Sequence, residues 1–333
     1  MKFGDVPVEQ ARGAILAHSM SCNGSRLRKG AILDDAHLAQ LSAAGITTVT
    51  VARMEQGDVH EDAAALQLAQ SICPNPASVN IRLSDAFTGR VNLIATTAGI
   101  VRLDRDKLIA MNAIDPMITV ATVPDYQQVA EGSLIATIKI ISYAVHQDQL
   151  SLACTRANAT ISLIAPQIKT ADLILSDIGT SVTEKGVSAI EARLAALNVT
   201  LSETRIVPHE TSAIADALGK SSAELSLILT GSATSDQEDV APRALRQAGG
   251  QLIRFGMPVD PGNLLFHGTL EGRPVIGLPG CARAPALNGA DWVMSRIICG
   301  ITPTAQDFAE MSVGGLLKEI PTRPLPRRSI KNA

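Results

Sequence analysis

Two segments of the chain share one pattern, a short apolar run that ends near glycine and passes through small residues into a helix pattern. The first is LILTGSATSDQEDVAP (Leu227–Pro242), and the second is VIGLPGCARAPALNGAD (Val275–Asp291). In a strand, loop and helix of this kind, the unpaired N–H groups of the helix start face the loop and can bind an anion. Two such loops in one region predict a cleft for a ligand with at least one phosphate.

The composition is typical of a soluble α/β protein and argues against nucleic acid as a partner. The chain has 333 residues, of which 46% are apolar and 2% aromatic, and its formal charge is −3. This length predicts two or three domains. A chain without a basic excess has no field to gather nucleic acid or anionic lipid, and so few aromatic side chains offer little surface for stacking bases.

The cysteine spacing indicates whether disulfides or a metal site are expected, and the apolar runs indicate the cellular compartment. The five cysteines are scattered without a CxxC or Cys/His ligand spacing, so neither a disulfide framework nor a structural zinc site is indicated. Asp5 and Glu9 stand where a signal peptide needs an apolar core. No apolar run reaches the ~18 residues of a membrane span. We therefore expect a cytoplasmic protein with no membrane partner.

Composition shifts divide the chain into four expected regions. Residues 1–74 form an α+β unit, with helix-like spacing over Val6–Leu16 and a later helix capped by Asp58 with Glu61 three residues on. Residues 75–158 form a small unit that is mostly β or α+β. Residues 159–303 form an α/β domain, and residues 304–333 form a basic, proline-containing tail.

The pattern over 159–303 alternates strands and helices. Its central apolar run, Leu225–Leu229, does not alternate with polar residues, as expected of a strand buried on both faces of a parallel sheet. This order predicts a three-layer α/β/α domain with a mostly parallel sheet. Ligands in such sheets bind beyond the carboxyl ends of the strands. Both glycine loops are expected at that edge.

The first loop offers small donors followed by carboxylates. We expect a phosphate to be held by the loop residues Thr230, Gly231, Ser232, Thr234 and Ser235. Three carboxylates then crowd the helix start, those of Asp236, Glu238 and Asp239. They could cap the helix, or Asp236 and Asp239 could hold Mg²⁺ together with substrate oxygens.

The second loop turns at Pro279-Gly280 and enters an expected helix with Pro285 near its start. Ala284 has no side-chain oxygen to cap that helix, so its first N–H groups are expected to be free for an anion or for water. Arg283 stands nearby to pair with the anion. Cys281 is a loop residue whose thiol would need a basic partner to act as a nucleophile.

A third candidate is SDIGTSVTEKGVSAI (Ser176–Ile190), which lacks the GxxxxGK[ST] pattern of a P-loop. Thr180 and Lys185 could contact a phosphate, or Lys185 could simply be solvated. His209 follows a strand at the same sheet end, and we expect a hydrogen-bonded structural role for it.

These motifs resemble a known family. Residues ~160–303 are similar to the molybdenum-cofactor biosynthesis domain shared by molybdopterin adenylyltransferases and molybdopterin molybdotransferases. TGSATSDQEDVAP resembles the family's TGG-type loop and helix start, and GNLLFHGTLEGRPVIGLPG resembles the molybdotransferase hairpin that ends in Leu-Pro-Gly. VEQARGAILAHS and LRKGAILDDAHLAQLSAAGITTVTV resemble the molybdotransferase N-terminal region. The whole chain is most similar to molybdopterin-binding proteins associated with a molybdopterin cytidylyltransferase.

The resemblance implies binding of molybdopterin or the molybdenum cofactor, with the pterin phosphate held at helix N-termini. It carries Gly231 over as a loop glycine, Asp239 as the acidic residue associated with catalysis, and Leu278–Gly280 as the second loop. Ser232 replaces a second glycine, and Cys281 stands where the molybdotransferase pattern has Asn-Pro. A Mg²⁺-dependent molybdotransferase or nucleotidyltransferase, and a generic mononucleotide-binding domain, therefore stay open as alternatives.

The resemblance also suggests protein partners. A molybdopterin cytidylyltransferase or a molybdoenzyme would receive the cofactor from this protein. Two small N-terminal units beside a cleft domain, in an apolar-rich chain, further predict a homo-oligomer.

Overall fold

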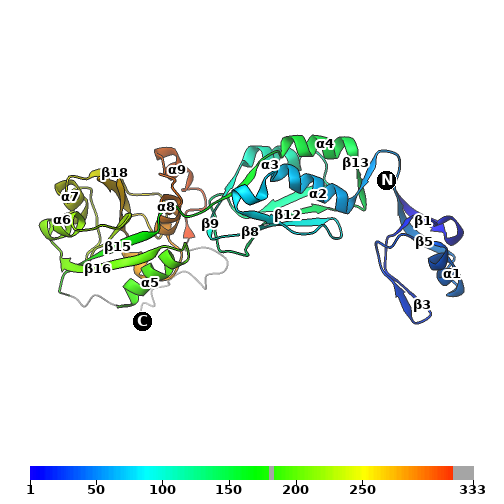
Figure 1. Ribbon diagram of the computed structural model, residues 1–333, viewed down its shortest axis with the longest axis horizontal. Helices are drawn as coiled ribbons and strands as arrows, with labels where there is room; N and C mark the ends of the chain where they lie inside the picture. Colours follow the sequence, from blue (N-terminus) through cyan, green and yellow to red (C-terminus); the bar gives the residue numbers. More distant parts are fainter. Residues whose placement is uncertain (180–183, 318–333) are drawn as a thin grey trace, which may run out of the picture. The chain divides into compact units, whose positions relative to one another are not determined.

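The computed structural model describes residues 1–179 and 184–317, without the side chains of Glu184 and Lys185, and the chain divides into two compact units (Figure 1). The first unit contains Met1–Thr97 and Val101–Ile164, and the second contains Ala98–Ile100 and the chain from Ala165 onward. None of the described helices has the length and apolarity that crossing a bilayer requires.

The first unit begins with a small antiparallel sheet. Strand β5 (Thr48–Arg53) lies between β1 (Lys2–Pro7) and β2 (Ile15–Leu16). The prediction of a helix over Val6–Leu16 is wrong. Val6 and Pro7 pair with β5, and only a 3-10 turn, η1 (Val8–Gln10), follows. A hairpin of two short strands and one helix complete this part: β3 (Met20–Cys22), β4 (Ser25–Leu27) and α1 (Asp35–Ala43).

The remainder of the first unit is α+β, with helices α2, α3 and α4 and a four-stranded antiparallel sheet in the order β10-β12-β8-β7. The helix expected to be capped by Asp58 begins later, at Glu61, and its cap is His60, because residues 58–60 pair with β13 instead. The elements are β6 (Asp58–His60), α2 (Glu61–Ile72), η2 (Pro76–Val79), β7 (Ile81–Leu83), β8 (Arg90–Ala95), β9 (Gly99–Leu103), α3 (Arg105–Asn112), β10 (Ile118–Thr122), β11 (Gln128–Val129), β12 (Leu134–Ile140), β13 (Ala144–His146), α4 (Gln147–Arg156) and β14 (Ile161–Ile164).

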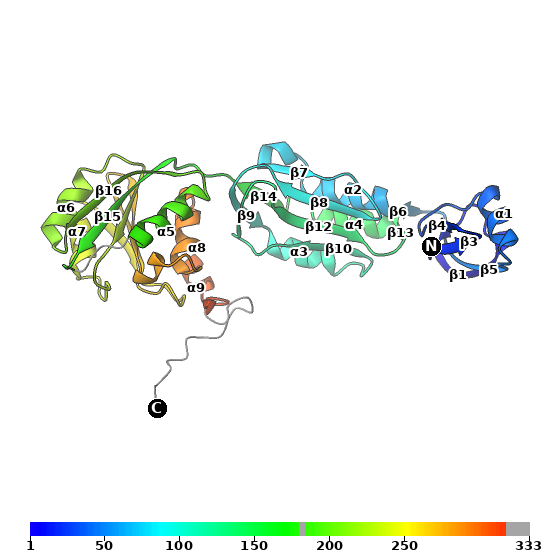
Figure 2. The same cartoon turned by 90° about the horizontal axis from the view of Figure 1, so that it is seen from below.

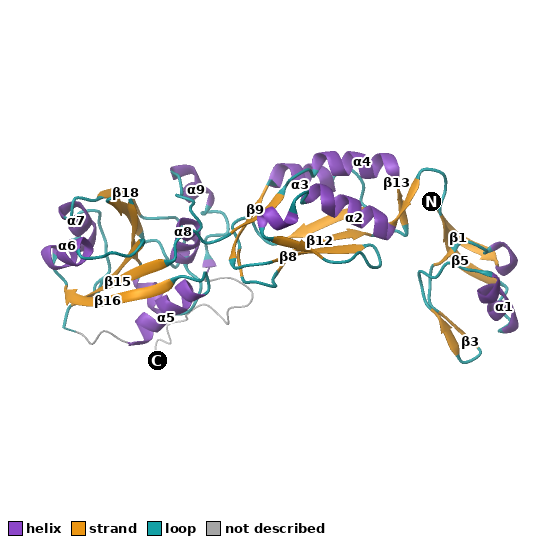
Figure 3. Cartoon of the chain, in the orientation of Figure 1, coloured by secondary structure: helices purple, strands orange, loops and turns teal. Residues whose placement is uncertain are grey.

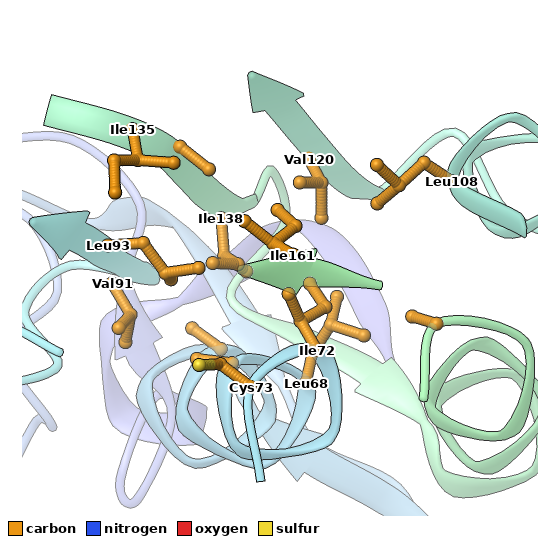
Figure 4. Close-up of a cluster of buried hydrophobic side chains, with 14 of the residues drawn as sticks. Leu68, Ile72, Cys73, Val91, Leu93, Leu108, Val120, Ile135, Ile138 and Ile161 are labelled. Atoms are coloured by element: carbon orange, nitrogen blue, oxygen red, sulfur yellow. The ribbon is translucent and has the colours of Figure 1, made fainter. Parts of the chain in front are cut away.

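Helix α2 supplies one wall of the core of this part. Its Leu68 and Ile72 are fully buried and lie against the buried strand residues Leu93 and Ile138 (Figure 4). Alanines 64, 65 and 69 occupy the same helix face, so the helix can approach the sheet closely. This apolar contact fixes the position of α2 against the sheet.

The second unit is built on one six-stranded sheet in the order β16-β15-β17-β20-β19-β18. The first four strands run parallel, β19 runs antiparallel to β20, and β18 pairs antiparallel with β19 and so runs in the direction of the first four. The strands are β15 (Thr170–Asp177), β16 (Thr200–Pro208), β17 (Leu225–Leu229), β18 (Gln251–Phe255), β19 (Phe266–Leu270) and β20 (Arg273–Leu278). All five residues of β17 are buried, as the sequence predicted.

Helices cover both faces of this sheet, as the secondary-structure view also shows (Figures 2 and 3). Leu173 and Leu227 pack on the side of α5 and α8, while Ile174 and Ile228 pack on the side of α6 and α7. The helices are α5 (Glu184–Ala195), α6 (Thr211–Gly219), α7 (Val240–Gln247), α8 (Gly289–Ile298) and α9 (Ala305–Glu310). The predicted three-layer α/β/α domain with a mostly parallel sheet is confirmed.

Gly277 of β20 gives a direct test of this packing. A Cβ atom at that position would meet the ring of buried Phe266, whereas a Cβ at Gly219, at the end of α6, would meet nothing within 4 Å. We expect Gly277→Ala to lower the free energy of unfolding by about 1–3 kcal/mol through overpacking. Gly219→Ala, the control, should leave it unchanged or raise it by about 0.4–1 kcal/mol. Urea unfolding measures both, and equal values for the two variants would contradict the packing.

Candidate functional site

The parallel strands bring four loops to one edge of the sheet. Strands β16, β15, β17 and β20 are neighbours in that order, and they end at Pro208, Asp177, Leu229 and Leu278. The two glycine loops follow β17 and β20, and the guanidinium of Arg283 in the second loop donates to the carbonyl of Thr230 in the first, at 2.6 Å. The expected convergence of the two loops is confirmed.

The peptide between Thr230 and Gly231 is held from both sides. Its C=O accepts the bond from Arg283, and its N–H donates to the hydroxyl of Ser176, on β15, at 3.1 Å. A Cβ on Gly231 would lie 2.7 Å from the carbonyl oxygen of Ser176 and 3.3 Å from the side chain of Ile178. The chain needs glycine at position 231 because the backbone of the loop approaches β15 so closely.

The hydrogen bonds continue to the next strand. The Ser176 hydroxyl also lies 2.8 Å from Nδ1 of His209, which directly follows β16. The backbone N–H of His209 donates to the carbonyl of Asp177 at 3.0 Å. A polar chain of three side chains and one peptide (His209, Ser176, the Thr230–Gly231 peptide and Arg283) thus crosses the sheet edge in strand order; we call it the edge chain.

The predicted hydroxyl donors of the first loop are partly used inside the loop. Thr230 and Thr234 are both buried, the Thr230 hydroxyl donates to the carbonyl of Ser232, and the two threonine hydroxyls lie 3.3 Å apart. Ser232 and Ala233 are exposed, and their N–H groups donate to no acceptor within the described residues. This loop therefore offers a ligand the N–H groups of Ser232 and Ala233 and the exposed hydroxyls of Ser232 and Ser235, rather than the two threonine hydroxyls.

Asp239 acts as the N-cap of α7. Its carboxylate accepts from the N–H of Ser235 at 2.9 Å and of Val240 at 2.7 Å, while Asp236 accepts from Glu238 N–H. The bond from Ser235, more than any other interaction, lowers the pKa of Asp239 from its ordinary 3.8. Within residues 1–179 and 184–317, no group of three or more His, Cys, Asp or Glu side chains could hold a metal. The alternative that Asp236 and Asp239 hold Mg²⁺ is not supported.

The helix after the second loop begins later than expected. Pro285 lies in the loop, and α8 begins at Gly289, with Asn288 as its N-cap. The Asn288 side-chain oxygen accepts from Ala290 N–H at 2.9 Å, and Asn288 N–H donates to the carboxylate of Asp291 at 2.8 Å, while Gly289 N–H donates to the carbonyl of Pro261. The expectation that this helix start has free N–H groups is therefore wrong, because its own capping box occupies them.

Arg193 of α5 holds the second loop in place. Its side chain is 10% exposed and pairs with Asp291, Nε to Oδ1, at 2.5 Å. It also donates to three loop carbonyls, those of Ala282, Ala284 and Ala286. A planar guanidinium can serve so many acceptors at once because its five N–H groups point in fixed directions. The carbonyls of Ala284 and Ala286 therefore accept from Arg193 and not from N–H groups of a helix.

The remaining residues of the second loop differ in exposure. Pro279 is buried and Gly280 is exposed. Arg283 is half-buried, burial lowers the pKa of its guanidinium, and no carboxylate among the described residues pairs with it. Burial raises the pKa of the Cys281 thiol, which disfavours the thiolate that a nucleophile needs. Among the described residues of the two loops, Arg283 is thus a cation without a carboxylate partner.

Two predicted contacts of the third candidate segment cannot be placed here. Thr180 and the side chain of Lys185 lie outside the described residues. The residues that sequence reasoning missed are Ser176 and Arg193, and His209 was given a structural role alone. Ser176 carries a weak signal, as the last small polar residue of a buried strand; nothing in the sequence indicates the role of Arg193.

Two family models match parts of the chain. Residues 179–296 match a family model described as a probable molybdopterin binding domain, and residues 5–53 match one described as a domain of unknown function. No curated protein matches the chain in sequence.

Three solved structures show weak similarity. They are a molybdopterin biosynthesis MoeA protein from Pyrococcus horikosii (10% identity, 90% of this chain, 74% of that chain, TM-score 0.29), a molybdenum cofactor biosynthesis protein B (16%, 40%, 88%, 0.27) and a CinA protein of unknown function from Thermoplasma acidophilum (16%, 35%, 90%, 0.26). TM-scores this low carry no inference about ligand or reaction.

The cap made by Asp239 predicts a stability effect that depends on pH. Asp239→Ala should lower the free energy of unfolding by about 1 kcal/mol at pH 7, and Asp239→Asn should cost less because asparagine also caps. Because the pKa of Asp239 is lowered in the fold, this stabilisation is present above pH 3.8 and is lost as pH falls further. Urea unfolding at pH 7 and pH 3 measures it. A difference between wild type and Asp239→Ala that is as large at pH 3 as at pH 7 would contradict the cap.

The contacts of Arg193 predict a larger effect. Arg193→Ala leaves Asp291 and three loop carbonyls without their partner, and breaking a buried pair costs about 3–5 kcal/mol. Arg193→Lys should fall between this value and wild type. The control is Arg246→Ala, which removes an ion pair to exposed Glu238 and should cost less than about 1 kcal/mol. Equal losses for Arg193→Ala and Arg246→Ala in urea unfolding would show that Arg193 does not hold the loop.

Proposed function

We propose that the second unit binds molybdopterin, or its molybdenum-loaded form, at the edge where the two glycine loops meet. The observation that carries the proposal is the half-buried, unpaired guanidinium of Arg283. A buried cation without an anion loses hydration and gains no pair energy in return. A phosphate monoester at this position would supply the missing charge and could accept two parallel N–H bonds from the guanidinium.

Backbone groups near Arg283 suit the same anion. The exposed N–H groups of Ser232 and Ala233 have no acceptor within the described residues, and the same holds for Gly280. Successive N–H groups in a turn form an anion-binding concavity. In this proposal the phosphate is held by loop N–H groups and Arg283, and not by the start of α8, whose N–H groups are used internally.

The family match supports a pterin as the remainder of the ligand. Residues 179–296, which match the probable molybdopterin binding domain, contain Gly231, Arg283 and Arg193, whose side chain holds the second loop. We infer a role in molybdenum cofactor biosynthesis, in which the protein holds the cofactor for maturation or transfer. Transfer to a molybdopterin cytidylyltransferase or to a molybdoenzyme stays a prediction, as does homo-oligomer formation.

The alternatives predict different behaviour. A molybdotransferase or nucleotidyltransferase would use Asp239 and Mg²⁺, but both carboxylate oxygens of Asp239 already accept backbone N–H bonds. Purified protein with molybdopterin, ATP, Mg²⁺ and molybdate would then release product, and Asp239→Asn would abolish that turnover without abolishing pterin binding. A generic mononucleotide-binding domain would bind ATP in preference to molybdopterin.

Arg283 provides the test of the binding proposal. We expect Arg283→Met to weaken molybdopterin binding by about 10-fold to 100-fold, because hydrogen bonds to charged groups contribute about 1.5–3 kcal/mol. Arg283→Lys should lose less, since it keeps the charge without the planar fork. Titration calorimetry, together with mass spectrometry of copurifying small molecules, measures both.

The control for Arg283→Met is Arg82→Met, which removes the same charge from an exposed position on β7 of the first unit. It should leave the molybdopterin affinity unchanged. Equal affinity of wild type and Arg283→Met, with both proteins folded, would remove Arg283 from the site.

A further inference from the structure

We propose that His209 is a ligand contact of this site, whose neutral imidazole donates its Nε2–H to the bound phosphate, and that Ser176 fixes the tautomer that makes this possible. The inference rests on the proposed function and adds a specific residue to it. His209 lies at the β16 end of the edge chain, opposite Arg283 at the β20 end.

The argument begins with the hydrogens on Ser176. The N–H of Gly231 can only donate, so the Ser176 hydroxyl oxygen must accept this bond. The hydroxyl hydrogen then needs an acceptor, and among the described residues the partner in reach is Nδ1 of His209, at 2.8 Å. Ser176 is 2% exposed, so water cannot readily serve instead. If Nδ1 carried the hydrogen, the buried hydroxyl hydrogen would be left without a partner, which is costly.

The tautomer follows from this bond. A neutral imidazole with an unprotonated Nδ1 carries its hydrogen on Nε2. No acceptor within the described residues takes that hydrogen. The charged groups in electrostatic reach include Asp239, and its carboxylate oxygens accept from Ser235 and Val240. The half-buried imidazole therefore presents a free donor at the sheet edge.

The edge chain joins the two side-chain contacts of the ligand. Arg283 and Ser176 bind opposite ends of one peptide unit, and Ser176 in turn orients His209. In this proposal the phosphate receives one charged donor from Arg283 and one donor from His209, in addition to loop N–H groups. Arg283 balances the ligand charge, whereas His209 adds a directed hydrogen bond.

The experiment compares two amide replacements of the imidazole. The amide nitrogen of glutamine lies near the position of Nε2, whereas that of asparagine lies near Nδ1. We expect His209→Gln to keep affinity for molybdopterin within about 3-fold of wild type, and His209→Asn and His209→Phe to lose about 5-fold to 10-fold. The same ranking is expected with inorganic phosphate as the probe, because the contact is to the phosphate.

A spectroscopic readout tests the tautomer without any ligand. In protein labelled with ¹⁵N on histidine, His209 should show a protonated Nε2 and an unprotonated Nδ1 near neutral pH. Ser176→Ala should release this preference and give a mixture of tautomers. A His209 protonated on Nδ1 in wild type would overturn the inference, whatever the affinities are.

The binding results distinguish failure of the inference on His209 from failure of the proposed function. If wild type binds molybdopterin and His209→Phe binds it equally well, the inference on His209 is overturned and the proposed function stands. If His209→Asn loses affinity for molybdopterin but not for phosphate, the contact is not to the phosphate, and the inference is again overturned. If folded wild type binds neither probe, the proposed function fails and the role of His209 fails with it.

Discussion

The second unit depends on how one peptide is held, that between Thr230 and Gly231. Where the parallel ladder of β15, β17 and β20 ends, side chains replace strand neighbours: Ser176 accepts the N–H and Arg283 donates to the C=O. This keeps the buried end of β17 hydrogen-bonded, as polar backbone groups away from water require. It also excludes any side chain at position 231, because a Cβ would meet the carbonyl of Ser176.

Capping decides which groups of the site remain available to a ligand. The starts of α7 and α8 are the expected anion sites, yet Asp239 and Asn288 already satisfy N–H groups there. A helix start can bind an anion only where its donors are not taken by its own sequence. The proposed binding therefore relies on loop N–H groups and on Arg283, which donates to the first loop and has no carboxylate partner among the described residues. Arg193 contributes indirectly, because its bonds to three carbonyls hold that second loop.

The fold of the second unit could be predicted closely from the sequence, since unalternating apolar runs and helix periods place strands and helices in a fixed order. This order of elements does not reveal where strand pairing replaces a helix that the local sequence predicts. Val6–Leu16 has helical spacing, but Val6 and Pro7 pair with β5. The helix with Asp58 as its expected cap starts at Glu61, because residues 58–60 pair with β13. Pro285 suits a first helical turn, but Arg193 takes the nearby carbonyls and Asn288 caps the helix.

By itself, the sequence determined the three-layer domain, the two glycine loops and their common edge, because these follow from local periodicity and from the rule that neighbouring parallel strands end together. Only the tertiary structure decided which hydrogen-bonding groups of the loops have a partner within the described residues and which remain available to a ligand. Ser176, Arg193 and His209 act through partners 33 to 98 positions away in the chain. A hydrogen bond is settled by distance and direction in space, and a spacing along the chain does not contain either.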